Sequence, residues 1–311
     1  MVEVVLVHGI GQRQSGPAEL GSVWRLGLSD GVWKAGDTVL AERLLRPGGA
    51  VGAVDCRMAF YADLFDRPGV QGAGDGLDGL SVEQTALAEE LAAVWLQAAA
   101  DSAGLGADQQ AAQAELARLA GTFGQELGAR NAARTALAGL ARLRWFAPTG
   151  MAFAQRFVNR ALVEVTRYLT EPGLRAAVQA RVSEHLAADT TVLIGHSLGS
   201  VIAYEAACRH GGALPLLLTL GSPLGVRTLI YDRLLPAPPV FPPTTQAWVN
   251  IAAGDDIVAA VPDLTALFAA TVPAGARWQG GLTVDNGATP HQAEHYLTKP
   301  QTGHQISTAL Q

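Results

Sequence analysis

The sequence has few cysteines, no excess of positive charge and no long uninterrupted hydrophobic run. Its two cysteines, Cys56 and Cys208, lie far apart, which favours two buried free thiols over a disulfide. The net charge is −6, and phosphate binding needs a basic face, so nucleic acid is excluded as the main partner. No run of about 18 apolar residues occurs, so we expect no transmembrane segment.

The first residues also lack the features of a secretory signal. Met1 leads directly into an apolar run at residues 2–7, without a basic leader or a cleavage site. For a chain that has not been trimmed, this predicts a cytoplasmic protein.

What the sequence does contain is enough apolar material for a large core. It is 49% hydrophobic and 16% charged, which excludes a disordered chain. A length of 311 residues suits one α/β domain with an insertion. Short apolar runs predict buried strands, and they are separated by longer helical patterns. The predicted strands cover residues 2–7, 57–61, 191–194, 214–220, 247–251 and 282–285.

One stretch carries most of the chemical information. The strand at 191–194 runs into Gly195-His196-Ser197-Leu198-Gly199, and residues 201–207 then favour a helix. A serine between a strand and a helix, in a Gly-x-Ser-x-Gly frame, is typical of a nucleophile elbow. Gly195 and Gly199 lack the β-carbons that would collide in so sharp a turn. We therefore predict that Ser197 is a nucleophile.

A second motif follows the first strand. Residues 2–7 end in His8-Gly9-Ile10-Gly11, where the backbone must turn. An N–H group at such a turn can stabilise an oxyanion, and so can the N–H group that follows the nucleophile. The predicted oxyanion hole consists of the amides of Ile10 and Leu198.

A serine nucleophile needs a base and an acid, which follow it in the order acid, then histidine, in this type of site. Two carboxylates lie just after the strand at 247–251. Asp256 precedes Ile257-Val258, an Asp-x-Val-like pattern typical of acid loops, and is therefore favoured over Asp255. Asp255 remains the alternative.

Three histidines follow the last predicted strand. His291 lies in the loop beyond it, where the base is expected, and is favoured. His295 lies at the start of a predicted terminal helix and is the alternative. His304 is expected on the surface.

The region 66–148 has a different pattern. Residues 69–79 are glycine-rich, and residues 81–100, 107–120 and 129–145 favour helices, the last of them basic and amphipathic. We predict a core domain of residues 1–65 and 149–311 and a helical insertion that forms a cap or lid. A helical decoration without a role in binding, or a membrane-surface helix, would give the same pattern.

Together these motifs resemble the α/β-hydrolase superfamily, and within it the lipase/esterase branch. The resemblance rests on residues 7–11, residues 195–199, residues 254–258 and His291. It implies an α/β-hydrolase fold, with a central, mostly parallel sheet flanked by helices, and a serine hydrolase that uses neither a metal nor another cofactor. Little sequence precedes the first strand, so the antiparallel strands of larger members are expected to be absent.

Two further segments resemble the group related to inositol deacylases. They are Gly-Ser-Pro-Leu-Gly at residues 221–225 and Trp-Val-Asn at residues 248–250.

The predicted function is hydrolysis of carboxylic esters through an acyl-enzyme intermediate. The expected partner is a small-molecule ester with a hydrophobic, lipid-like acyl group. A thioesterase or an acyltransferase would use the same triad, and a non-catalytic binding protein could share the fold.

Overall fold

The computed structural model describes residues 3–46, 48–66, 77–122 and 151–311, together with residues 136, 139, 140 and 143. The chain divides into two compact units. The first comprises Met1–Leu64 and Ala176–Gln311, and the second comprises Phe65–Arg175. Residues 149–175 thus group with the inserted region, whereas the sequence placed them with the core.

The first unit contains one six-stranded sheet. Its strands are β1 (Val4–Val7), β2 (Cys56–Ala59), β3 (Val192–His196), β4 (Leu214–Leu220), β5 (Thr245–Ala253) and β6 (Arg277–Val284). Their order is β2-β1-β3-β4-β5-β6, and every neighbouring pair among them is parallel. The predicted α/β class and parallel sheet are confirmed, and each predicted strand overlaps an observed one.

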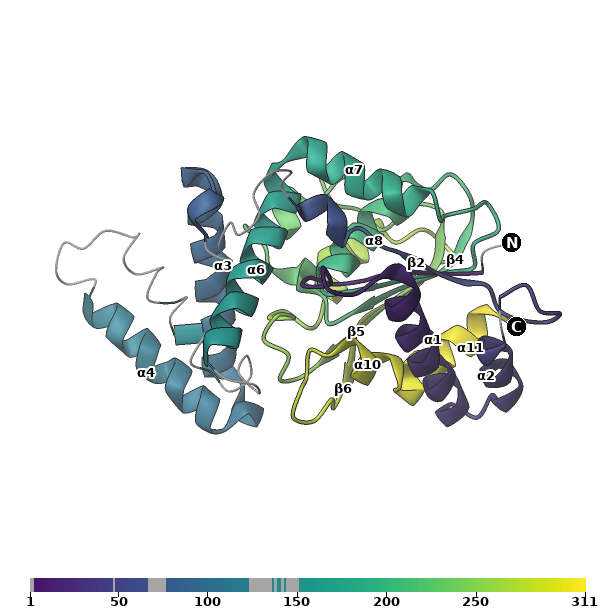
Figure 1. Ribbon diagram of the computed structural model, residues 1–311, viewed down its shortest axis with the longest axis horizontal. Coiled ribbons are helices and arrows are strands. Elements are labelled where there is room, and N and C mark those ends of the chain that lie inside the picture. Colours follow the sequence, from purple (N-terminus) through teal and green to yellow (C-terminus); the bar gives the residue numbers. More distant parts are fainter. Residues whose placement is uncertain are drawn as a thin grey trace. The chain divides into compact units, whose positions relative to one another are not determined.

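Helices cover both faces of this sheet (Figure 1). One face carries α1 (Pro17–Lys34), α2 (Thr38–Leu45), α10 (Ala293–Leu297) and α11 (Pro300–Ala309), and the other carries α7 (Pro172–Ser183) and α8 (Leu198–Arg209). Trp24 and Leu28 of α1 pack with Leu6, Ile194 and Leu218 in one buried cluster. Burial on both faces explains why the strands are continuous apolar runs rather than alternating ones.

Shorter elements complete this unit. They are α9 (Thr265–Phe268) and 3₁₀ turns at Ala62–Phe65, Pro223–Gly225, Tyr231–Arg233 and Ala269–Thr271. The turn at Ala62–Phe65 ends at the first residue of the second unit. Cys56 and Cys208 are free thiols, as predicted, but they are only partly buried.

The strand order creates a switch point between β1 and β3. The chain leaves β1 toward β2 on one side, and later strands are added on the other side, beyond β3. Loops after such neighbouring strands diverge at the carboxyl edge of a sheet and leave a crevice where ligands bind. The loop with Ile10 and the turn with Ser197 follow these two strands.

Glycines allow α1 to approach the C-terminal helices closely. A β-carbon on Gly303 of α11 would lie 2.0 Å from the carbonyl oxygen of Gly31 in α1. One on Gly31 would lie 2.2 Å from the carbonyl oxygen of Leu297 in α10. Neither helix can move away without opening the core beneath them, so these glycines fix the position of α10.

The second unit contains α3 (Val82–Asp101), α4 (Ala107–Thr122) and α6 (Met151–Thr170), with 3₁₀ turns at Leu77–Gly79 and Ala103–Leu105. The first two match the helices predicted at 81–100 and 107–120. A capping box between Ser81 and Gln84 begins α3. Trp95 of α3 is buried, as are Val158 and Leu162 of α6.

Two predictions in this region fall mainly outside the described residues. They are the basic helix at 129–145 and most of the glycine-rich loop at 69–79. Among the helices that the structure does describe, none combines the length and apolar character needed to cross a membrane.

The glycine contact can be tested by adding one methyl group. Gly303→Ala should lower the free energy of unfolding by about 3 kcal/mol, because the new β-carbon meets backbone atoms that cannot rotate away. Gly21→Ala on α1 is the matched control. Its β-carbon would meet only the Met58 side chain, at 3.4 Å, so stability should be unchanged or up to about 1 kcal/mol higher. Urea unfolding of both variants measures the difference, and equal midpoints would contradict the packing argument.

Candidate active site

Ser197 has an unusual backbone conformation. Its φ is 55° and its ψ is −129°, and no other non-glycine residue in the described part of the chain has a positive φ. Such a conformation costs on the order of 1–3 kcal/mol and persists only where the surroundings enforce it. The turn joins β3 directly to α8, which confirms the predicted strand, turn and helix.

Two glycines enforce this turn. A β-carbon on Gly195 would lie 2.3 Å from the carbonyl oxygen of Gly199. One on Gly199 would lie 2.2 Å from the carbonyl oxygens of both Val7 and His8, at the end of β1. The turn after β3 is therefore held against β1 by backbone contact alone.

The loop after β1 passes directly beside Ser197. A β-carbon on Gly9 would lie 2.9 Å from the β-carbon of Ser197. His8 shapes this loop, since its Nδ1–H donates to the Gly9 carbonyl at 2.7 Å and its Nε2 accepts from the Tyr61 N–H at 3.2 Å. Burial lowers the pKa of His8 to about 4, so the ring is neutral and can act as both donor and acceptor.

The two amides predicted to form an oxyanion hole belong to residues on either side of this contact between the β1 loop and Ser197. Leu198 is the first residue of α8, where an N–H group has no partner within the helix. Ile10 follows Gly9 in the loop beside Ser197. Within the described residues, neither N–H donates to a protein acceptor. The positive end of the α8 dipole adds to the potential at this point.

A chain of hydrogen bonds joins the three predicted triad residues. The Ser197 hydroxyl lies 2.9 Å from Nε2 of His291, and Nδ1 of His291 lies 2.8 Å from Oδ2 of Asp256. The carboxylate can only accept, so Nδ1 carries the proton and Nε2 is free to accept from serine. Loops after three different strands thus supply the predicted nucleophile, base and acid.

Asp256 is buried but held as a carboxylate. Burial alone would raise its pKa, but the neighbouring His291 and hydrogen bonds from His291 and Tyr296 outweigh this and hold the pKa below its usual value. Its other oxygen, Oδ1, accepts from the backbone N–H groups of Val258 at 3.0 Å and Ala259 at 3.4 Å.

The sequence alternatives lie elsewhere. Asp255 is only half-buried, and no hydrogen bond joins it to a histidine within the described residues. Burial raises the pKa of this carboxyl. His295 Nδ1 lies 3.0 Å from the carbonyl oxygen of Asn286 and 3.1 Å from the Thr289 hydroxyl, and so is engaged within its own loop. Ser222, a second serine after a strand, accepts from the Leu224 N–H and caps a 3₁₀ turn.

Two residues to which the sequence analysis gave no role at the site lie against the predicted acid, Asp256. Tyr296 on α10 donates its hydroxyl proton to Oδ2 of Asp256 at 2.7 Å. Gly221, at the end of β4, has φ 53°, and a β-carbon there would lie 2.8 Å from Oδ2 of Asp256 and 3.3 Å from Nδ1 of His291. A glycine directly after a strand indicates that another group approaches the backbone closely, so Gly221 carried a sequence signal. No comparable sequence signal marked Tyr296.

His196, inside the elbow, supports the loop that carries His291. Its Nε2–H donates to the backbone carbonyl of His291 at 2.8 Å, and the two rings lie 4.7 Å apart. Burial lowers the pKa of His196 to about 3, with the nearby His291 adding to the effect. The ring is therefore neutral, and it serves as a donor to the loop after β6.

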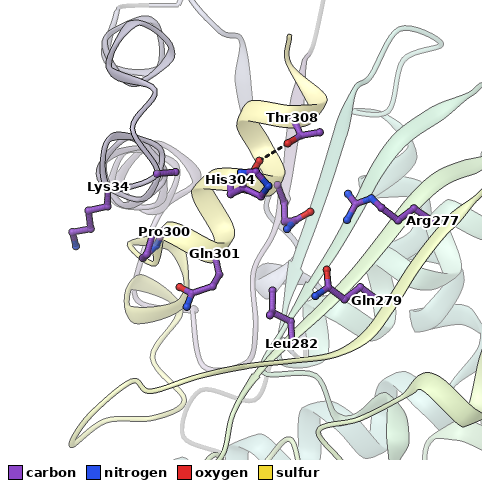
Figure 2. Close-up of a pocket in the computed structure, with 10 residues that line it drawn as sticks. Lys34, Arg277, Gln279, Leu282, Pro300, Gln301, His304 and Thr308 are labelled. Atoms are coloured by element: carbon purple, nitrogen blue, oxygen red, sulfur yellow. Dashed lines mark hydrogen bonds between the residues drawn. The ribbon is translucent and has the colours of Figure 1, made fainter.

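A groove of about 850 Å³ lies elsewhere on the first unit, between β6, α11 and the end of α1 (Figure 2). Arg277 and Gln279 line one side, with Gln301 and Thr308 opposite. His304 also lines it and is exposed, as predicted. No residue of the predicted triad lines this groove, so it is separate from the candidate active site.

No group of three or more histidine, cysteine, aspartate or glutamate side chains in the described residues is arranged to hold a metal ion. We compared the chain with protein-family models, curated proteins and solved structures, and none of these comparisons gave a match. The family resemblance therefore rests on the motifs alone.

The buried neutral histidines predict acid sensitivity. The pKa of His196 is lowered in the fold, so its contribution to stability is complete above its unfolded pKa of about 6.5 and is lost as the pH falls toward about 3. The loss should reach about 3 kcal/mol near pH 4. In His196→Gln, the free energy of unfolding should fall less steeply between pH 7 and pH 4.

Urea titrations at several pH values measure this slope. His304→Gln removes an exposed histidine and should leave the slope unchanged. A slope in His196→Gln equal to that of the wild type would show that His196 is not held neutral.

Proposed function

We propose that this chain is a serine hydrolase of the α/β-hydrolase type, which cleaves carboxylic esters through an acyl-enzyme intermediate. The observation that carries the proposal is the continuous hydrogen-bond chain from Ser197 through His291 to Asp256. It joins a strained serine at a helix N-terminus to a base and a buried acid, which is the arrangement that activates a serine. The switch-point position of Ser197 supports the same function.

In the first step, Ser197 Oγ forms a bond to the ester carbonyl carbon, and its proton passes to Nε2 of His291. The oxyanion that forms accepts hydrogen bonds from the amides of Ile10 and Leu198. As the bond from carbon to the leaving oxygen breaks, His291 gives its proton to the departing alkoxide. The products of this step are the free alcohol and an ester of Ser197.

In the second step, a water molecule attacks the acyl carbon. Nε2 of His291 takes one proton from the water and returns it to Ser197 Oγ as the acyl bond breaks, which releases the acid. Asp256 keeps Nδ1 protonated throughout and stabilises the charged imidazolium. A thioester would follow the same steps with a thiolate leaving group, and an alcohol in place of water would give acyl transfer.

The substrate class is proposed from the apolar character of the chain and its lipase-like motifs. A series of nitrophenyl esters from acetyl to dodecanoyl separates short-chain esterase activity from activity on lipid-like esters. A thioester substrate tests for thioesterase activity, and an alcohol added as a competing acceptor tests for acyl transfer.

The direct test is covalent labelling by a fluorophosphonate. This reagent phosphonylates a serine only where a base activates it, so wild-type protein should gain the mass of one adduct. Ser197→Ala should gain none. Ser222→Ala, which removes a buried serine after the neighbouring strand, should still be labelled. Folded wild-type protein without an adduct, or an adduct on Ser197→Ala, would contradict the proposal.

Two adjacent carboxylates provide a matched test of the acid. Asp256→Asn should lower kcat for a nitrophenyl ester on the order of 10³–10⁴-fold, because the base loses its orienting partner. Asp255→Asn changes the same charge one residue away and should leave kcat close to the wild-type value. Steady-state kinetics on both variants show which aspartate is the acid. A large loss of kcat in Asp255→Asn, with kcat unchanged in Asp256→Asn, would assign that role to Asp255.

A further inference from the structure

The hydroxyl of Tyr296 contacts the predicted acid at a particular atom. Tyr296 is fully buried, and its O–H donates to Oδ2 of Asp256 at 2.7 Å. The same oxygen of Tyr296 accepts the Ala253 N–H at 2.8 Å, at the end of β5. Donation into the phenol oxygen polarises its O–H bond and strengthens the hydrogen bond that it makes.

The two oxygens of Asp256 have separate roles. Oδ1 accepts two backbone N–H groups, from Val258 and Ala259, and these fix the carboxylate to its own loop. Oδ2 accepts from His291 and from Tyr296. The tyrosine therefore competes with the base for the negative charge on a single oxygen, and the carboxylate remains anchored when the tyrosine is removed.

We propose that Tyr296 is a positioning residue that limits the basicity of His291 by sharing the carboxylate oxygen to which His291 donates. This rests on the proposed function, in which His291 is the base. A donor on Oδ2 reduces the charge that stabilises protonated His291, so the imidazole gives up its proton at lower pH. Tyr296 thereby extends the pH range in which the base is neutral and can accept from Ser197.

The other titratable groups described near Asp256 and His291 do not share the carboxylate oxygen to which His291 donates. His196, on β3, lies beside His291 but is buried and neutral. Asp255, in the loop after β5, is half-buried, and Asp285, after β6, acts on Asp255. Among the described groups with a direct hydrogen bond to Asp256, only His291 and Tyr296 carry a titratable side chain.

The test is an NMR titration of the His291 Cε1 proton, assigned by its loss in His291→Gln. In Tyr296→Phe the midpoint of this titration should move to higher pH. Tyr231→Phe is the matched control, since it removes a tyrosine hydroxyl that donates to the Leu267 carbonyl, and it should cause no change. The acidic limb of kcat/KM should move with the titration.

Replacing Tyr296 by 3-fluorotyrosine keeps the hydroxyl and makes it a stronger donor, so the pKa of His291 should fall slightly. An unchanged His291 pKa in folded Tyr296→Phe would overturn the proposal. A lower His291 pKa would also overturn it, because Tyr296 would then serve to hold Asp256 in place. The titration needs no turnover, so a protein that shows the predicted shift but no hydrolysis contradicts only the proposed function.

Discussion

The close contact between the turn after β3 and the end of β1 is the constraint on which the candidate site depends. Gly195 and Gly199 let α8 begin within backbone contact of both strands, and a β-carbon at either position would lie less than 2.5 Å from backbone oxygen. This contact forces Ser197 to positive φ and brings the Ile10 loop beside its side chain. The positions of Ser197 and of the proposed oxyanion donors therefore follow from one packing arrangement.

The positions of Asp256 and His291 depend on a second close contact, between α1 and the C-terminal helices. Gly31 and Gly303 hold α10 and α11 against α1, and α10 carries Tyr296. Tyr296 bonds to the end of β5 and to Asp256, which bonds to His291. The geometry of Asp256 and His291 is thus linked to helix packing far from Ser197 in sequence.

Local pattern was enough to predict the sheet and the turn at Ser197. An apolar run, two glycines and a helical pattern are contiguous in sequence, so their geometry follows from backbone sterics. The choice of Asp256 and His291 required only the order of strands and loops, and the structure brings both within hydrogen-bond distance of each other. The loop with Ile10, a proposed oxyanion donor, lies beside Ser197 because β1 and β3 are neighbouring strands.

The contact of Tyr296 with Asp256 and the boundary between the two units were not predicted from the sequence. A tyrosine on a short helix resembles any core aromatic, and its partner becomes visible only when α10 is placed against β5. The sequence analysis assigned residues 149–175 to the core domain, whereas α6 groups with α3 in the second unit. Such packing between distant segments has no local signal.

The most direct test of the central claim is to trap the acyl-enzyme itself. Wild-type protein is mixed with a nitrophenyl ester, quenched in acid during the first turnover and digested for peptide mass mapping. The account predicts a burst of about one nitrophenolate per protein, with the acyl group on the peptide that contains Ser197. Rapid turnover without a burst, and with an acyl group on another residue, would contradict a nucleophile at the turn after β3.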